Sequence, residues 1–107
     1  MGANEKAEAL TKRIAENIRA IVAIREQNIG DVERAAGVSA GYTSRKTHGG
    51  MESMTIHTVV RFADALGVEF KDLLERDYIS EFRRKRIAEL EEELRILKEL
   101  EGEKIAV

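Results

Sequence analysis

The first regular pattern in the chain is a row of apolar residues at spacings of three and four, between about Ala7 and Glu26. The row consists of Leu10, Ile14, Ile18, Ile21 and Val22. The residues between them are mostly charged or polar, so the apolar side chains share one face of a helix. The pattern therefore predicts an amphipathic helix whose apolar face packs against the rest of a domain.

Two shorter helices are predicted next, separated by a tight turn at Gly37. Asn28 can cap the first of them, which runs from about Ile29 to Ala36. Glycine adopts the left-handed conformation of such a turn without steric cost, and Val38 fills the corner. Ser39 caps the second helix, which runs to about His48. This order is the layout of a helix-turn-helix, whose second helix can enter the major groove of DNA.

A fourth and a fifth helix are predicted after a polar loop that ends at Met54. Thr55 caps the fourth helix, and Gly67 ends it. The predicted buried face of the fourth helix consists of Ile56, Val59, Val60, Ala63 and Leu66. The short fifth helix contains Val68, Phe70, Leu73 and Leu74.

The last part of the chain, from about Asp77 to Glu101, is almost free of helix-breaking residues. Its apolar side chains follow the spacing of the a and d positions of a coiled coil, at Ile87, Leu90, Leu94 and Leu97. We expect the chain to fray from Gly102 onward. The predicted fold class is all-α, with a five-helix domain in residues 1–76 and one long C-terminal amphipathic helix in residues 77–107.

Composition narrows the possible functions. The 107 residues include no cysteine, which excludes disulfides, thiolate zinc sites and a cysteine nucleophile. No apolar run is long enough to span a membrane or to act as a signal region, so a cytoplasmic location is expected. The net charge is −2, but residues 12–61 hold eight basic and five acidic side chains, a local charge of +3 (8 − 5). Binding to DNA phosphates depends on such a local excess and not on the charge of the whole chain.

Two motifs resemble the lambda-repressor/Cro-like (XRE) family. Ala36-Gly37-Val38-Ser39 matches the turn that precedes the recognition helix in that family. Ala63-Asp-Ala-Leu-Gly-Val-Glu-Phe-Lys-Asp-Leu-Leu74 resembles its last two helices, and the two matches together cover roughly residues 14 to 75. The resemblance implies a lambda-repressor-like fold that binds double-stranded DNA.

Carried over to this chain, the family's DNA-reading positions are Ser39, Ala40, Gly41, Tyr42, Ser44, Arg45 and His48. Arg45 is the strongest candidate for base recognition, because a guanidinium can pair bidentately with O6 and N7 of guanine. Tyr42 has two interpretations: it contacts a phosphate or a thymine methyl group, or it fills the core.

Three positions depart from the family pattern. Thr43 and Lys46 stand where the recognition helix usually turns two large apolar residues inward. A threonine suits a half-buried site, whereas Lys46 has to extend its ammonium group to water. Ile29 stands where the family often has a glutamine that binds phosphate.

Other candidate chemistry is sparse. His48 and His57 have no acidic or cysteine partner at ligand spacing, so no metal site is expected. No catalytic motif, cofactor site or small-molecule site is recognisable, and an enzyme is not expected. The basic residues Lys12, Arg13 and Arg83-Arg-Lys-Arg86 are either phosphate contacts or solvated helix faces.

The sequence predicts a homodimer formed through the row Ile87, Leu90, Leu94 and Leu97. The alternative is that the last helix folds back onto its own domain through Tyr78, Ile79 and Phe82. The function that these features favour is a sequence-specific transcription regulator, a dimeric repressor that reads the major groove with the 39–48 helix. The alternative is a protein-interaction module (an adaptor, antirepressor or antitoxin-like partner) with weak or no operator binding.

Overall fold

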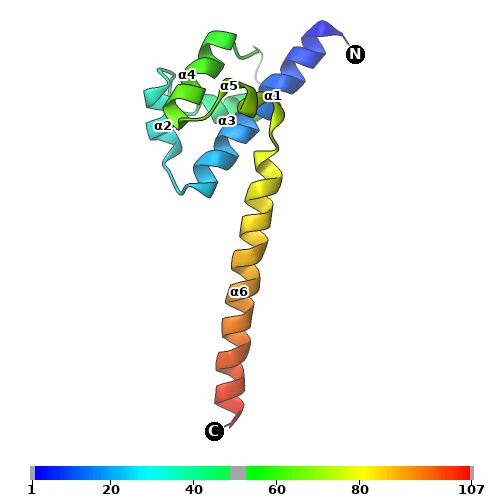
Figure 1. Ribbon diagram of the computed structural model, residues 1–107, viewed down its shortest axis with the longest axis vertical. Helices are drawn as coiled ribbons and strands as arrows, with labels where there is room; N and C mark the ends of the chain where they lie inside the picture. Colours follow the sequence, from blue (N-terminus) through cyan, green and yellow to red (C-terminus); the bar gives the residue numbers. More distant parts are fainter. Residues whose placement is uncertain (1, 49–52, 107) are drawn as a thin grey trace.

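The computed structural model describes residues 2–48 and 53–106, and within these residues every regular element is a helix. The helices are α1 (Ala3–Ile24), α2 (Ile29–Ala35), α3 (Tyr42–Thr47), α4 (Ile56–Leu66), α5 (Phe70–Glu75) and α6 (Tyr78–Ala106). Five of them form a small bundle, and the sixth is a long rod that projects from it (Figure 1). The all-α fold class is confirmed.

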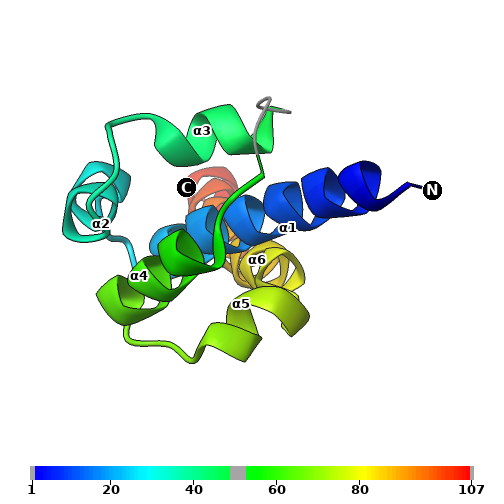
Figure 2. The same ribbon diagram turned by 90° about the horizontal axis from the view of Figure 1, so that it is seen from above.

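Helix α1 is the centre of the bundle. Viewed from above, α1 runs between α3 on one side and α4 with α5 on the other (Figure 2). Its residues Ile14, Ile18 and Ile21 are buried against Phe62 of α4 and Leu73 of α5. The predicted apolar face of α1 is therefore the face that holds the domain together.

Two of the three predicted side-chain caps, Asn28 and Thr55, are confirmed. The side chain of Asn28 accepts a hydrogen bond from the Asp31 amide (3.2 Å), and that of Thr55 accepts one from the Thr58 amide (3.2 Å). Gly67 ends α4 in the left-handed conformation, with φ of 66°. These signals lie within a few residues of the helix end that they set.

Three residues predicted to be buried are exposed in the structure. Leu10 lies in the N-terminal half of α1 and is 44% exposed, although its neighbour Thr11 is buried. Ile56 occupies the first turn of α4 and Val60 its edge, whereas Phe62, which the prediction omitted, is fully buried. Periodicity identified the faces of these helices but not the extent of the core along them.

Asn17 ties α1 to the end of the bundle. Its side chain is buried, and its amide nitrogen Nδ2 donates hydrogen bonds to the carbonyl oxygens of Leu73 (2.9 Å) and Arg76 (3.0 Å). These carbonyls belong to the end of α5 and to the link that leads into α6. Asn17 therefore fixes the place at which the chain leaves the bundle.

Replacing this amide tests its contribution to stability. Asn17→Ala is expected to lower the free energy of unfolding by about 1–3 kcal/mol, because it leaves two carbonyl oxygens without their donor. Arg13→Ala is the matched control, since Arg13 donates a hydrogen bond to the neighbouring Glu75 carbonyl (3.1 Å) but at the surface. Its effect is expected to stay within about 0.5 kcal/mol. Urea unfolding followed by circular dichroism measures both variants, and equal losses would show that Asn17 has no special role.

Asp77 precedes α6 and stabilises its first turn. Its carboxylate accepts hydrogen bonds from the amide (3.0 Å) and the hydroxyl (2.6 Å) of Ser80. These bonds lower the pKa of Asp77. Because the folded pKa is lowered, this stabilisation is present at neutral pH and is lost as the pH falls through the folded pKa.

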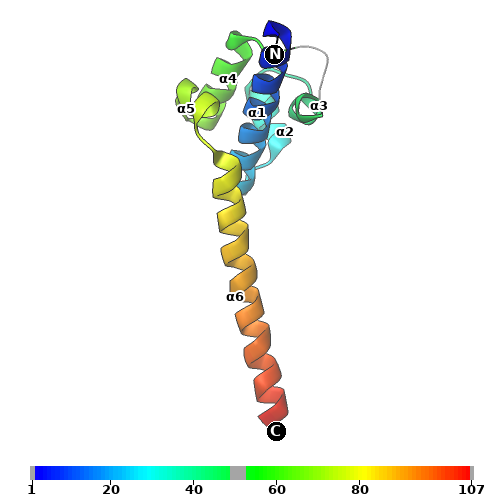
Figure 3. The same ribbon diagram turned by 90° about the vertical axis from the view of Figure 1, so that its right-hand side faces the viewer.

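The first turns of α6 pack on the bundle, and the rest of the helix leaves it (Figure 1, Figure 3). Tyr78 is buried, Ile79 and Phe82 are half-buried against the core, and Lys85 Nζ donates to the Ile24 carbonyl (2.7 Å). Beyond this point the helix continues to Ala106, giving the molecule extents of 64 × 33 × 22 Å. The helix extends past Gly102, where the sequence predicts that fraying begins, and the fraying itself stays a prediction.

Candidate nucleic-acid interface

The helix-turn-helix unit consists of α2, the turn that follows it, and α3. Gly37 has a φ of 76°, the left-handed conformation that the sequence predicts for the corner. Val38 is half-buried against the core, and its amide donates to the Glu33 carbonyl (3.0 Å). The predicted corner is therefore confirmed.

The start of the recognition helix differs from the prediction. Helix α3 begins at Tyr42, and Gly41 is its N-cap residue with a φ of 82°. Ser39 does not cap the helix. Its hydroxyl oxygen accepts a hydrogen bond from Arg45 Nη2 (2.8 Å). Residues 39–41 therefore belong to the turn, and another group has to satisfy the free amides at the helix start.

That group is the carboxylate of Glu33 on α2, which is 2% exposed. It accepts hydrogen bonds from the amides of Gly41 (3.2 Å) and Thr43 (2.8 Å) and from the Thr43 hydroxyl (3.0 Å). A capping residue normally supplies these bonds from its own side chain. Here the cap comes from the preceding helix and locks the two helices of the motif together.

Sequence reasoning missed Glu33, although a signal was present. Val32 and Ala36 both face the core, and Glu33 lies between them on the short α2. The side chain of Glu33 therefore points into the domain. There it meets Thr43, the polar residue on the buried face of α3. The buried acid on α2 and the buried threonine on α3 are therefore hydrogen-bonding partners.

Thr43 is fully buried and not half-buried as expected. Besides donating to Glu33, its hydroxyl oxygen accepts a hydrogen bond from Arg19 Nη1 on α1 (3.3 Å). Lys46 is half-buried, and its ammonium nitrogen lies 5.3 Å from the centroid of the Tyr42 ring. The hydroxyl of Thr43 is therefore accommodated by hydrogen bonds, and the ammonium group of Lys46 lies over the Tyr42 ring.

Tyr42 packs against the core. Its ring stacks on that of Phe62, with centroids 6.0 Å apart and an interplanar angle of 29°. The packing interpretation of Tyr42 therefore describes its contact within the chain, and its contact with DNA stays a prediction.

The remaining predicted residues form the outer surface of the turn and α3. Ser39, Ala40, Arg45 and His48 are exposed, and Gly41 and Ser44 are half-buried. Arg45 folds back over the turn, donating to the Ser39 hydroxyl oxygen (2.8 Å) and to the Ala40 carbonyl (3.2 Å). His48 Nδ1 lies 2.7 Å from the Ser44 carbonyl, which can only accept, so Nδ1 carries a proton. The surface thus presents a guanidinium and an imidazole held in defined positions.

The other basic residues are partly engaged within the chain. Arg13 donates to the Glu75 carbonyl, and Lys85 donates to the Ile24 carbonyl. Lys85 and Arg86 also pair with Glu89, at 3.7 and 3.3 Å. Two of the four basic residues at the start of α6, Lys85 and Arg86, are therefore engaged within the chain.

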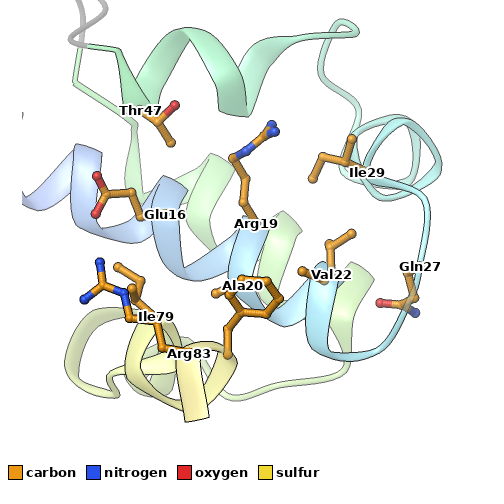
Figure 4. Close-up of a pocket in the computed structure, with 11 residues that line it drawn as sticks. Glu16, Arg19, Ala20, Val22, Gln27, Ile29, Thr47, Ile79 and Arg83 are labelled. Atoms are coloured by element: carbon orange, nitrogen blue, oxygen red, sulfur yellow. The ribbon is translucent and has the colours of Figure 1, made fainter. Parts of the chain in front are cut away.

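A groove of about 630 Å³ lies between α1, the end of α3 and the start of α6 (Figure 4). It is lined by Glu16, Arg19, Ala20, Val22, Ala23, Gln27, Ile29, Thr47, Ile79, Phe82 and Arg83. Arg19 points toward α3 and Arg83 lies on the α6 side. Among the residues that the structure describes, no group of three His, Asp or Glu side chains is placed to hold a metal ion.

The structure is a bundle around a central helix, with a helix-turn-helix at its surface. This architecture places the chain in the class of helix-turn-helix DNA-binding domains. A family model described as the Cro/C1-type HTH DNA-binding domain matches residues 17–77, and the chain belongs to this family. The match runs from the buried Asn17 to the end of the link before α6. The family resemblance predicted from the sequence is thereby confirmed. Neither curated proteins nor solved structures gave a match.

The family is a class of DNA-binding modules, and typically not one of enzymes. In residues 2–48 and 53–106, no helix combines the length and the apolar character that crossing a membrane requires.

Proposed function

We propose that the chain is a sequence-specific transcription regulator that binds double-stranded DNA as a dimer and acts as a repressor. The observation that carries this proposal is the outer surface of the turn and α3. This surface is exposed, and the buried carboxylate of Glu33 fixes its position by accepting hydrogen bonds from the start of α3. In this proposal residues 1–76 bind DNA, and residues 77–107 pair the subunits. The proposed location is the cytoplasm, together with the DNA that the protein binds.

Arg45 is the proposed base-reading residue. Its guanidinium is exposed and reaches over the turn to Ser39 and Ala40. On binding, it exchanges these hydrogen bonds for a bidentate pair with O6 and N7 of a guanine. Ala40, Gly41, Ser44 and His48 border the same surface and supply shape and polar contacts. Tyr42 contributes by holding α3 on the core and not by direct contact.

The proposed homodimer forms through Ile87, Leu90, Leu94 and Leu97 of α6. One recognition helix contacts only a few base pairs, so a two-fold pair that reads two half-sites gains both affinity and specificity. The exposure of these four side chains on a single chain supports the pairing.

Selection from a pool of random DNA duplexes tests the proposal. We expect enrichment of a two-fold symmetric site, with an affinity that falls steeply between two salt concentrations in an anisotropy titration. If no sequence is enriched and binding is only weak and salt-sensitive, the regulator proposal is wrong.

Arg45→Ala is expected to weaken binding to the selected site by about tenfold to a hundredfold, which corresponds to about 1–3 kcal/mol for a bidentate base contact. Binding to unrelated duplexes should change much less. Lys71→Ala is the matched control, because it removes one exposed positive charge from α5. Anisotropy titrations with selected and unrelated duplexes separate the two effects. An equal loss on both duplexes would assign Arg45 to a phosphate.

A second candidate is a protein-interaction module on the same fold, with weak or no operator binding. The observation in its favour is that Arg45 bonds to its own turn while an apolar row on α6 is exposed. This candidate predicts that the selection yields no site and that α6 is the docking surface for a protein partner.

A further inference from the structure

We propose that α6 pairs with α6 of a second copy in parallel and in register, as a two-stranded coiled coil between Arg86 and Lys98. This inference rests on the dimer of the proposed function and adds its direction. A parallel pair brings the two DNA-binding domains to the same end of the rod. An antiparallel pair would separate them by about the length of the helix, at 1.5 Å per residue.

The seam of the coiled coil is uncovered in the single chain. Ile87, Leu90, Leu94 and Leu97 are 55%, 46%, 52% and 62% exposed. They lie on the part of α6 that has already left the bundle, so their own domain does not shield them (Figure 1). In heptad terms Ile87 and Leu94 are a positions, and Leu90 and Leu97 are d positions. Ile87 supplies the β-branched residue at a that, with leucine at d, is favourable in parallel dimers, and the second a position holds leucine.

The charges beside the seam favour the parallel direction. Arg86 and Glu93 occupy g positions, and Glu91 and Lys98 occupy e positions. In a parallel pair each g residue faces the e residue five places further along the partner helix. Arg86 then faces the partner's Glu91, and Glu93 faces the partner's Lys98. Both pairs join opposite charges, and two-fold symmetry gives each of them twice.

The charges on the other faces of the helix are already paired within α6. Arg95 bonds to Glu92 and Glu99, and Glu89 pairs with Lys85 and Arg86. By contrast Glu91, Glu93 and Lys98 are exposed and, in the part of the chain that the structure describes, make no ion pair. Three of the four residues that flank the seam are thus available to a partner helix.

The antiparallel direction places like charges together. With Ile87 opposite the partner's Leu97, Glu91 faces the partner's Glu91 and Glu93 faces the partner's Glu93. In the same register Arg84 faces the partner's Lys98. A single contact favours this direction, between Arg83 and the partner's Glu101. Arg83 and Glu101 lie at the ends of the seam, where water screens their charges, and the same holds for Arg84 and Lys98. The repulsion between the two copies of Glu91 and between the two copies of Glu93 therefore decides against the antiparallel direction.

Cysteine cross-linking distinguishes the two directions, because the chain has no cysteine of its own. In a parallel dimer the two copies of residue 97 lie in one layer, so oxidised Leu97→Cys should form a disulfide-linked dimer on a non-reducing gel. Glu99→Cys, on the outer face two residues away, is the matched control and should stay unlinked. Linkage only in a mixture of Ile87→Cys and Leu97→Cys chains would overturn the parallel direction but leave the dimer standing.

A charge exchange supplies a second test without cysteine. In a parallel dimer Glu91→Arg puts like charges beside Arg86, so we expect the dimer to weaken about fivefold. Adding Arg86→Glu should restore its affinity to within about twofold. Sedimentation equilibrium measures both. No change with Glu91→Arg would overturn the parallel direction, and a monomeric unmodified chain would overturn the dimer itself.

Discussion

Replacing Glu33 with alanine should lower the free energy of unfolding by about 3 kcal/mol or more. The buried carboxylate accepts hydrogen bonds from two amides and one hydroxyl at the start of α3. A hydrogen bond to a charged group contributes about 1.5–3 kcal/mol, and leaving its buried donors unpaired adds to the loss. The first turn of the recognition helix should also lose its protection against amide hydrogen exchange, at Gly41 and Thr43 in particular.

Two further variants test whether the stability lost in Glu33→Ala comes from the hydrogen bonds of its carboxylate. Glu33→Gln keeps one oxygen acceptor for the Thr43 amide but places an NH2 group among donors, so an intermediate loss is expected. Asp64→Ala removes an exposed acid from α4 and should change stability by less than about 0.5 kcal/mol. Urea unfolding compares the three. If Glu33→Ala were as stable as Asp64→Ala, the carboxylate would not be the cap of α3.

This cap explains which part of the site the sequence could predict. Asn28, Gly37, Thr55 and Gly67 act on amides or torsions in their immediate neighbourhood, and each lies where the sequence placed it. The start of α3 depends instead on Glu33, eight to ten residues earlier. A prediction from local spacing therefore chose the nearby Ser39, which points to Arg45 in the structure.

The same distinction applies to α6. The sequence left two alternatives open, folding back onto the domain or pairing with a second copy. In the structure the first turns, with Tyr78, Ile79 and Phe82, pack on the bundle. The row from Ile87 to Leu97 lies beyond the bundle and stays exposed. Periodicity located both apolar groups, but only the angle at which α6 leaves the bundle separates their roles. The DNA-reading residues and the dimer remain predictions.

Leu94→Glu should abolish the dimer while leaving the domain folded. Leu94 is 52% exposed in the single chain and lies far along α6 from the bundle. Its loss should therefore leave the unfolding of the domain unchanged. In the proposed pair two leucine side chains become buried, each contributing about 1.5–3 kcal/mol. At 1.4 kcal/mol per factor of ten, the dissociation constant of the dimer should rise by more than about a hundredfold.

Ile96→Glu is the matched control for this variant. Ile96 lies on the same stretch of α6 and is 44% exposed, but it is at a c position, off the seam. It should leave the dimer intact, as measured by sedimentation equilibrium, and thermal unfolding should be the same for both variants. On the selected DNA site, Leu94→Glu should weaken binding steeply and Ile96→Glu should not, because only the dimer presents two recognition helices to one duplex. Equal dimer affinity in the two variants would mean that a surface other than this seam joins the subunits.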